Sequence, residues 1–329
     1  MKKFLLRTIL FFGILLLLAW SADIWITHQF KKLESSPFGN WNDIYSSDIQ
    51  SDVLIIGSSR AYVQFNPRIL DSVLHINSYN LGMNGRAVES QVIKYHTYRR
   101  KHNAKPKLIL FEIYQGTLDT SNGFDRLQFV PYLKDPVLWN DIRKVDGFSW
   151  ADCFIPCWRY SHYKKDVKDI ILGKSFYYCD PKNKLYKGFC DFDKPWDGSR
   201  LAKIDTIQYS RIPSAIHELD QFLRECQNDG IRVVFVMAPY YIGATKKISN
   251  LDGMYQLFYS ITEPYQIPIM DYTYSPISCD TAYFYNNTHL NRKGATLFSL
   301  KLAHDLDSLH LIPGKENYTP PKYVRKYDL

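Results

Sequence analysis

The sequence predicts an α/β fold in which helices cover both faces of a parallel β-sheet. Short, continuous apolar runs, such as Val-Leu-Ile-Ile at residues 53–56, are typical of strands that are buried on both faces. These runs alternate along the chain with longer segments of helical periodicity, an order that predicts βαβ units with right-handed crossovers. In such folds, active sites lie at the carboxyl ends of the strands.

The predicted elements can be placed in order along the chain. Strands are predicted at residues 53–56, 76–81, 108–114, 233–237 and 267–272. Helices are predicted at residues 67–75, 87–102, 213–228 and 293–309. Asn66 and Pro67 suit the N-cap and the first position of the first helix, and Gly230 suits a stop after the third.

A large insertion interrupts this alternation at residues 117–205. It contains four tryptophans and four of the six cysteines, and it is too long for a plain loop. The domain as a whole spans residues 51–312. Residues 28–50 are polar and turn-rich, which predicts a stalk, and residues 313–329 are predicted to form a flexible tail. Aromatic residues make up 16% of the chain, a surplus that indicates either an aromatic-lined ligand groove or a general compositional bias.

The N-terminus predicts a membrane helix. Three basic residues precede an uncharged, mostly apolar run over residues 8–22. The run reaches the length of a membrane span, about 20 residues, if Asp23 snorkels to the far interface. Trp20 and Trp25 then lie in the aromatic belt. A cleaved secretory signal, with its cleavage site at residues 19–21, is the competing interpretation.

We favour an uncleaved signal anchor over residues 1–27. The positive-inside rule keeps its basic start in the cytoplasm, so the remaining chain is expected on the extracytoplasmic (periplasmic) side of a membrane. Six cysteines agree with an oxidising compartment. The spacing allows two local disulfides, Cys153–Cys157 and Cys179–Cys190, with Cys226 and Cys279 as buried thiols. Six free thiols are the alternative.

The composition argues against several classes of function. The net charge of +8 comes from 41 basic and 33 acidic residues, but the basic residues are dispersed. Because no helix-turn-helix or zinc-finger pattern accompanies them, nucleic acid is not an expected partner. Gly-Lys-Ser at residues 173–175 resembles the end of a P-loop, yet Lys168 stands where its first glycine belongs. No metal-binding pattern is found, and we expect neither a metal nor an organic cofactor.

Three segments bring polar residues to the ends of predicted strands. Gly-Ser-Ser-Arg at residues 57–60 follows a buried strand, where a serine is either an exposed nucleophile or a helix cap. Asn-Leu-Gly-Met-Asn-Gly at residues 80–85 allows close backbone approach to a ligand but lacks the dinucleotide fingerprint. Residues 286–291 precede the last helix and carry His289, which we place near the serine as a general base.

The order and spacing of these three segments resemble the SGNH, or GDSL-type, hydrolase superfamily, over residues 52–116 and 205–312. The resemblance implies a three-layer, flavodoxin-like parallel sheet. It places the nucleophile at Ser59, the base at His289 and an oxyanion glycine at Gly85. The closest pattern is that of membrane-anchored members involved in alginate acetylation and in D-alanine transfer to teichoic acid.

The chain departs from this pattern at three positions. Ser58 replaces the family's Asp beside the nucleophile. Asn286 stands at the third position of the triad, where a neutral amide can orient His289 but cannot stabilise an imidazolium by charge; Asp271 and Asp280 are the carboxylates that can substitute for it. The family's oxyanion Asn is missing after the third strand, where Gln115 is the one amide at hand; with the backbone N–H of Ser59 and Gly85 it completes the expected oxyanion site.

The resemblance implies a serine esterase or O-acyltransferase that acts on ester groups of a cell-envelope or exported polysaccharide. Ser59 would attack the ester carbonyl after His289 takes its proton. Expected partners are therefore an acylated carbohydrate, the membrane through the N-terminal helix, and a membrane-bound acyltransferase. The alternative is a catalytically degenerate member that binds glycan or serves in assembly, with Trp158 and Trp196 as candidate sugar platforms.

Overall fold

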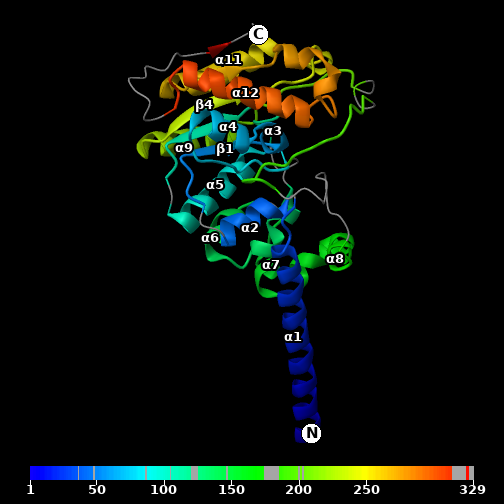
Figure 1. Ribbon diagram of the computed structural model, residues 1–329. Helices are drawn as coiled ribbons and strands as arrows, with labels where there is room; N and C mark the ends of the chain where they lie inside the picture. The colour runs from blue at the N-terminus through cyan, green and yellow to red at the C-terminus, as the bar shows by residue number, and fades with distance from the viewer. Residues whose placement is uncertain are drawn as a thin grey trace.

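The computed structural model describes residues 1–35, 37–46, 49–85, 87–103, 105–119, 125–145, 147–173, 185–198, 201, 204–312 and 324–325. A long helix, α1 (Lys2–Lys31), projects from an α/β domain (Figure 1). The domain contains a parallel sheet with the strand order β2-β1-β3-β4-β5-β6. The strands are β1 (Val53–Ile56), β2 (Ser78–Asn80), β3 (Leu108–Glu112), β4 (Arg232–Met237), β5 (Ile269–Asp271) and β6 (Val324–Arg325). The predicted α/β fold with a parallel sheet is confirmed.

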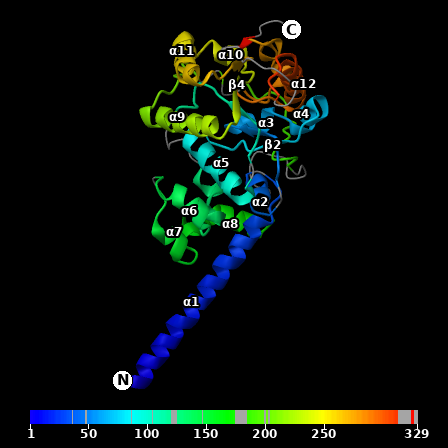
Figure 2. The ribbon, with the colours of Figure 1, turned by 90° about the vertical axis from the view of Figure 1, so that its left-hand side faces the viewer.

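Helices cover both faces of the sheet, and Figure 2 shows the two layers on opposite sides of β4. One layer consists of α5 (Val88–His102), α9 (Pro213–Asn228) and α11 (Leu251–Thr262), which pack on side chains such as Leu54 and Phe111. The other consists of α3 (Ser59–Gln64), α4 (Pro67–Leu74) and α12 (Arg292–Ser308), which pack on alternate side chains such as Ile55 and Leu110. The central strands β1, β3 and β4 therefore carry long apolar runs, because each side-chain direction meets a helix layer.

The chain direction across the sheet reverses between β1 and β3. From β1 the chain passes through α3 and α4 to β2 at the sheet edge, and then through α5 to β3 on the other side of β1. Adjacent crossovers on opposite faces leave a crevice at the carboxyl ends of β1 and β3, the place where ligands bind in open α/β sheets. The functional residues are expected there.

The stalk predicted over residues 28–50 is wrong. α1 continues to Lys31, and a second helix, α2 (Phe38–Ser46), follows. Phe30, Phe38 and Trp41 are fully buried in the same apolar core as the sheet. In the sequence, these three aromatic residues are separated by polar ones, so no apolar pattern indicated that they are buried. The segment belongs to the domain. Asp23 does not snorkel either: its side chain is buried against the insertion.

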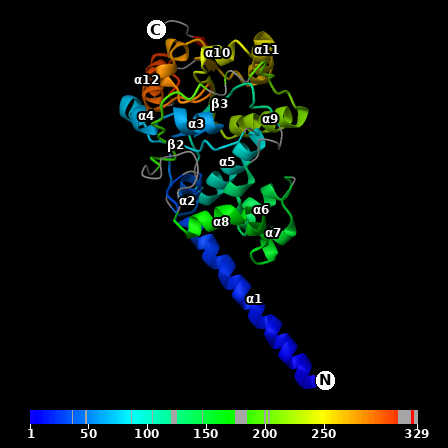
Figure 3. The same cartoon turned by 90° about the vertical axis from the view of Figure 1, so that its right-hand side faces the viewer.

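The insertion contributes helices, and its described residues contribute no strand to the sheet. Its helices are α6 (Pro136–Ile142), α7 (Trp150–Phe154) and α8 (Lys164–Ile171). α8 packs against α1 and α6 packs against α5, and Figure 3 shows all three helices at the end of the domain from which α1 projects. Residues 185–198 then return to the sheet, where the Lys187 carbonyl accepts a hydrogen bond from Asn80 N at 2.9 Å.

The described residues also form several short elements. They are α10 (Ile242–Thr245) and the 3-10 helices η2 (Arg126–Gln128), η3 (Val130–Tyr132), η4 (Trp158–Tyr163), η6 (Glu263–Tyr265), η7 (Pro276–Cys279) and η8 (Thr281–Tyr283). Of the tail predicted over residues 313–329, the structure describes Val324–Arg325, which pair with β5 as β6; the rest lies outside the described residues.

The cysteines depart from the expectation in part. Cys190 is disulfide-bonded; its expected partner, Cys179, lies outside the described residues. The pair Cys153–Cys157 is wrong, because both are free thiols whose sulfurs instead approach the carbonyl oxygens of Leu133 and Ala19. Two further cysteines were expected to be buried thiols: Cys226 is one, whereas Cys279 is an exposed free thiol.

Candidate functional site

The turn after β1 presents Ser59 at the carboxyl edge of the sheet. Gly57 has φ +153°, and a Cβ there would lie 2.6 Å from Glu112 Cβ, so the turn can press against β3 because the residue is glycine. Ser58 caps α3 by accepting a hydrogen bond from Arg60 N. Ser59 is the first residue of the helix. Ser58 is thus the cap, which leaves Ser59 available for chemistry.

Ser59 and His289 meet although 230 residues separate them. Ser59 Oγ lies 2.8 Å from His289 Nε2, a hydrogen-bond distance. The loop that carries the histidine is held by Asn291, which caps α12 through Gly294 N. It is also tied to α3, because Gln64 Nε2 donates to the Thr288 carbonyl at 3.1 Å. The geometry is that of a nucleophile and its base.

The side-chain oxygen of Asn286 fixes the histidine ring. Asn286 Oδ1 accepts from the backbone N–H groups of Thr288 and His289, each at 2.9 Å. Because two donors need an acceptor, the amide presents its oxygen here. His289 Nδ1 lies 3.1 Å from this oxygen and 2.7 Å from Thr288 Oγ1, which itself donates to Asn286 Oδ1. Nδ1 therefore carries the proton, and Nε2 is left to accept from Ser59.

Thr288 is a member of this constellation that the sequence analysis did not single out. The neutral amide of Asn286 selects the correct tautomer, which is the geometric part of the role that an aspartate has in a triad. The two substitute carboxylates have other partners: Asp271 Oδ1 accepts from Thr273 N, and Asp280 caps η8 through Ala282 N. The position beside Nδ1 thus belongs to Asn286 and Thr288.

A cavity of about 210 Å³ opens beside the pair. Its lining residues are Ser59, Tyr62, Val63, Asn84, Gly85, Cys190, Tyr285, Asn286 and His289. Gly85, the expected oxyanion residue, has φ +122°, a conformation that favours glycine. The three polar segments of the sequence therefore converge on one cavity.

Gln115 lies outside this cavity, and Asn84 lines it instead. Gln115 Nε2 donates to Tyr240 Oη at 3.1 Å, and its side chain lines a separate cavity with Arg60. Asn84 lines the cavity of Ser59, and its Nδ2 has no hydrogen-bond partner among the described residues. The Asn-Gly pair that follows the predicted second strand was the signal for it, but the sequence analysis assigned a role there to Gly85 alone.

A buried ion pair supports the nucleophile turn from below. Arg60 Nε lies 3.5 Å from Glu112 Oε1, and Glu112 Oε2 accepts from Ser58 N at 3.1 Å and from Ser58 Oγ at 2.8 Å. Arg60 Nη2 donates to the Ala238 carbonyl at 2.5 Å. Burial raises the pKa of Glu112 above its ordinary value, against the opposing effect of Arg60 and the two Ser58 donors. This pair connects the ends of three strands and fixes the residue before Ser59.

Residues 185–198, the segment of the insertion that returns to the sheet, form one wall of the cavity. Cys190 N donates to the Tyr62 carbonyl at 3.0 Å, which places the disulfide-bonded residue against α3. Phe192 stacks on Tyr285 with ring centroids 4.1 Å apart, and Tyr285 lies parallel to the His289 ring at 5.3 Å. The histidine therefore has an aromatic neighbour on one face, and that neighbour is held by the insertion.

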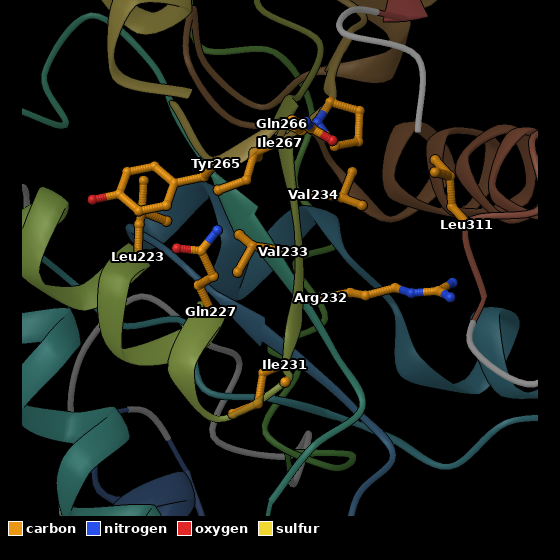
Figure 4. A pocket seen from close by; sticks show the side chains of 12 residues that line it. Leu223, Gln227, Ile231, Arg232, Val233, Val234, Tyr265, Gln266, Ile267 and Leu311 are labelled. Carbon is orange, nitrogen blue, oxygen red and sulfur yellow. The ribbon is translucent and has the colours of Figure 1, made fainter. Parts of the chain in front are cut away.

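A larger cavity, of about 270 Å³, lies at the opposite edge of the sheet (Figure 4). Its lining includes Gln227 at the end of α9, Arg232 at the start of β4, and Tyr265. The described lining residues include no serine, histidine, cysteine or carboxylate. Size therefore does not locate the chemistry, and we assign the candidate site to the smaller cavity.

No group of three or more His, Cys, Asp or Glu in the described part of the chain is arranged to hold a metal ion. Comparison with known protein families and with curated proteins finds no match to this chain. The assignment of the site therefore rests on its geometry.

Proposed function

We propose that the protein is an SGNH-type serine ester hydrolase or O-acyltransferase. One observation carries the proposal: Ser59 Oγ lies 2.8 Å from His289 Nε2, while Asn286 and Thr288 hold the proton on Nδ1. This tautomer lets Nε2 take the hydroxyl proton as Ser59 attacks an ester carbonyl. The strand order β2-β1-β3-β4-β5, which is that of flavodoxin-like sheets, agrees with the same family.

The reaction proceeds through an acyl-enzyme. Ser59 Oγ bonds to the carbonyl carbon, His289 passes the proton to the leaving alkoxide, and the ester C–O bond breaks. The backbone N–H groups of Ser59 and Gly85 bind the oxyanion, and the Asn84 amide is the third donor, the role first assigned to Gln115. Water then releases the acid in a hydrolase, and a sugar hydroxyl accepts the acyl group in a transferase.

The proposed substrate is an ester on a cell-envelope or exported polysaccharide. α1 is a helix long and apolar enough to cross a membrane. It continues without a break through residues 19–21, where Cys157 Sγ contacts the Ala19 carbonyl, and this favours an uncleaved anchor. The cavity suits a small acyl group. The basic N-terminus, under the positive-inside rule, supports an extracytoplasmic position for the domain.

The neutral Asn286 favours a second candidate, a degenerate glycan-binding or assembly protein. The tryptophans first considered for such binding lie outside the cavity lining: Trp158 is exposed near α1, and Trp196 packs on Tyr241 and Phe284. Such a protein predicts no turnover and glycan affinity that Ser59→Ala leaves unchanged.

Hydrolysis of p-nitrophenyl acetate by the full chain in detergent separates the two. We expect turnover that falls by roughly 10³-fold or more in Ser59→Ala, because nucleophile and base act as a unit. Ser260→Ala, an exposed serine on α11, is the matched control and should retain full activity. Turnover that is equal in Ser59→Ala and Ser260→Ala would contradict the enzyme proposal.

The oxyanion donors can be ranked in the same assay. Asn84→Ala should lower turnover by roughly 10²-fold, as removal of one oxyanion donor does. Gln115→Ala should lower it less, because that side chain serves Tyr240 in a separate cavity. A larger loss of turnover in Gln115→Ala than in Asn84→Ala would instead identify Gln115 as the oxyanion donor.

A further inference from the structure

The insertion exposes an unusual set of apolar side chains. After residue 31, the described residues expose eight large hydrophobic side chains, and six of these lie between residues 150 and 172. The six, which we call the apolar surface, are Trp150, Phe154, Ile155, Trp158, Ile171 and Leu172. Trp150 is 65% exposed and Phe154 is 63% exposed. Exposed apolar groups gathered in this way mark an interaction surface.

This surface lies where α1 leaves the domain. Cys157 N donates to Asp23 Oδ1 at 3.0 Å, Cys157 Sγ approaches the Ala19 carbonyl at 3.4 Å, and Lys134 Nζ lies 4.1 Å from the Trp20 ring centroid. Phe154 and Trp158 are three residues before and one residue after Cys157. Figures 1 and 3 show α7 and α8 beside the domain end of α1. The apolar surface is therefore level with residues 19–23.

The length of α1 puts that level at the edge of a bilayer. Residues 4–22 rise about 28 Å at 1.5 Å per residue, close to the thickness of about 30 Å of a hydrocarbon core. Arg7 lies one turn from the start and can snorkel to the near interface. Asp23 then marks the far interface, where tryptophan side chains are enriched in membrane proteins.

A buried charge cluster keeps the insertion fixed on the helix. Asp23 and Arg159 are both about 1% exposed at their side chains, and Arg159 Nη2 lies 2.8 Å from Asp23 Oδ2. Lys134 Nζ lies 2.5 Å from the same oxygen. One turn further along α1, Thr27 Oγ1 forms a hydrogen bond with Tyr160 Oη at 2.7 Å. Because these contacts join α1 to the insertion directly, the apolar surface cannot turn away from the bilayer without breaking them.

We propose that the apolar surface is seated in the lipid interface, so that the domain rests on the membrane rather than standing off it on a single helix. Exposed Lys164, Lys165 and Lys168 on α8 adjoin the surface and would contact anionic headgroups. We choose the bilayer as the partner of this surface because the surface adjoins a helix that would already lie in the membrane. The inference rests on the proposed membrane anchor and is independent of the chemistry at Ser59.

Tryptophan quenching by brominated lipid tests it. The full chain is reconstituted into vesicles of phosphatidylcholine and phosphatidylglycerol, with and without brominated acyl chains. The emission of each tryptophan is the difference between wild type and its Trp→Phe variant. We expect the emission of Trp150 and Trp158 to be lost in brominated vesicles. Trp196 is the matched control, and its emission should be the same in both.

Trp20 separates the surface from the anchor. Quenched Trp20 with unquenched Trp150 and Trp158 would overturn the lipid-seated surface while leaving the anchor intact, and is the result expected if a second copy or another protein covers it. Unquenched Trp20 would overturn the anchor and the surface together. Hydrolysis by Ser59 is unaffected in either case.

The lysines give a second readout. Quenching of Trp158 should increase with the fraction of phosphatidylglycerol in the wild type. This dependence should disappear in the combined variant Lys164→Gln, Lys165→Gln and Lys168→Gln. A dependence that persists unchanged in the variant would remove the lysines from the proposal.

Discussion

Two buried carboxylates, one beneath the candidate site and one at the domain end of α1, are held in the same way. Glu112 lies beneath the nucleophile turn, accepts a backbone N–H from Ser58 and pairs with Arg60. Asp23 lies in α1, accepts a backbone N–H from Cys157 and pairs with Arg159. Each is about 1% exposed. In both places a charge is buried only where an arginine and a backbone donor compensate for the lost water.

The two clusters differ in what they join. Glu112 connects the ends of neighbouring strands, so it serves the geometry of one sheet edge. Asp23 connects the first helix to residues 134–159 of the insertion, so it sets the orientation of the domain relative to α1. The comparison predicts that substitutions at the site and substitutions at the domain end of α1 act independently. The following experiments measure their separate effects on stability and on ester turnover.

The largest effect is expected at the base of α1. Asp23→Ala leaves Arg159 buried without its carboxylate, which should lower the free energy of unfolding by about 3–5 kcal/mol. Denaturation of the full chain in detergent measures it. The double variant Asp23→Leu with Arg159→Met should recover most of the loss. A loss below about 1 kcal/mol would mean that solvent, not Arg159, compensates the charge.

A smaller loss is expected from the disulfide that walls the cavity. Replacing Cys190 with alanine should lower the free energy of unfolding by about 2–4 kcal/mol, because the unfolded chain loses a constraint. Reductant should have the same effect on the wild type and none on the variant. Peptide mapping without reduction should link Cys190 to Cys179. A free thiol at Cys179 would contradict that pairing and the oxidising location expected from it.

The third effect concerns Asn286. Its replacement by alanine removes the acceptor that selects the tautomer of His289, so ester turnover should fall by roughly tenfold to a hundredfold. That is less than the loss of the base itself, which contributes about 10²–10⁴-fold. Asn286→Asp keeps an oxygen for the two backbone donors and should retain turnover. If Asn286→Asp is as impaired as Asn286→Ala, the oxygen is not the feature that matters.

The smallest effect is a pH dependence at Glu112. Because burial raises the pKa of this carboxyl, its contribution to stability is complete below the ordinary pKa of about 4.3 and is lost as the pH rises through the folded-state pKa. Glu112→Gln lacks this loss. The free energy of unfolding of the variant, relative to wild type, should therefore improve as the pH rises through the folded-state pKa of Glu112. A constant difference from pH 4 to pH 7 would contradict the raised pKa.

The same comparison shows what could be predicted from the sequence. The strand at residues 53–56 and the helix at residues 213–228 were placed correctly because each carries an unbroken periodic signal with clear ends. Ser59 and His289 were correctly predicted to lie close together, because parallel strands bring their carboxyl ends to one edge. Asn84 was missed because an Asn-Gly pair also suits a plain turn.

The base of α1 could not be predicted in this way. Asp23 and Arg159 are 136 residues apart, and neither lies in a pattern that indicates the other. A charge within an apolar run is ordinarily placed at an interface, which is why snorkelling was expected. The sequence predicts a stalk over residues 28–50 because the few aromatic residues there, which the structure buries, are separated by polar ones. Both the burial of Asp23 and the packing of residues 28–50 depend on contacts with distant parts of the chain, which local sequence patterns do not reveal.

The central claim is that His289 activates Ser59, and covalent labelling by a fluorophosphonate tests it most directly. The probe needs an activated serine but no correct substrate, so it also detects a transferase that ignores small esters. We predict labelling of the full chain at Ser59, mapped by mass spectrometry. The labelling should be lost in His289→Ala and retained in Asp23→Leu with Arg159→Met. Folded protein that is not labelled, or is labelled equally in His289→Ala, would contradict the account.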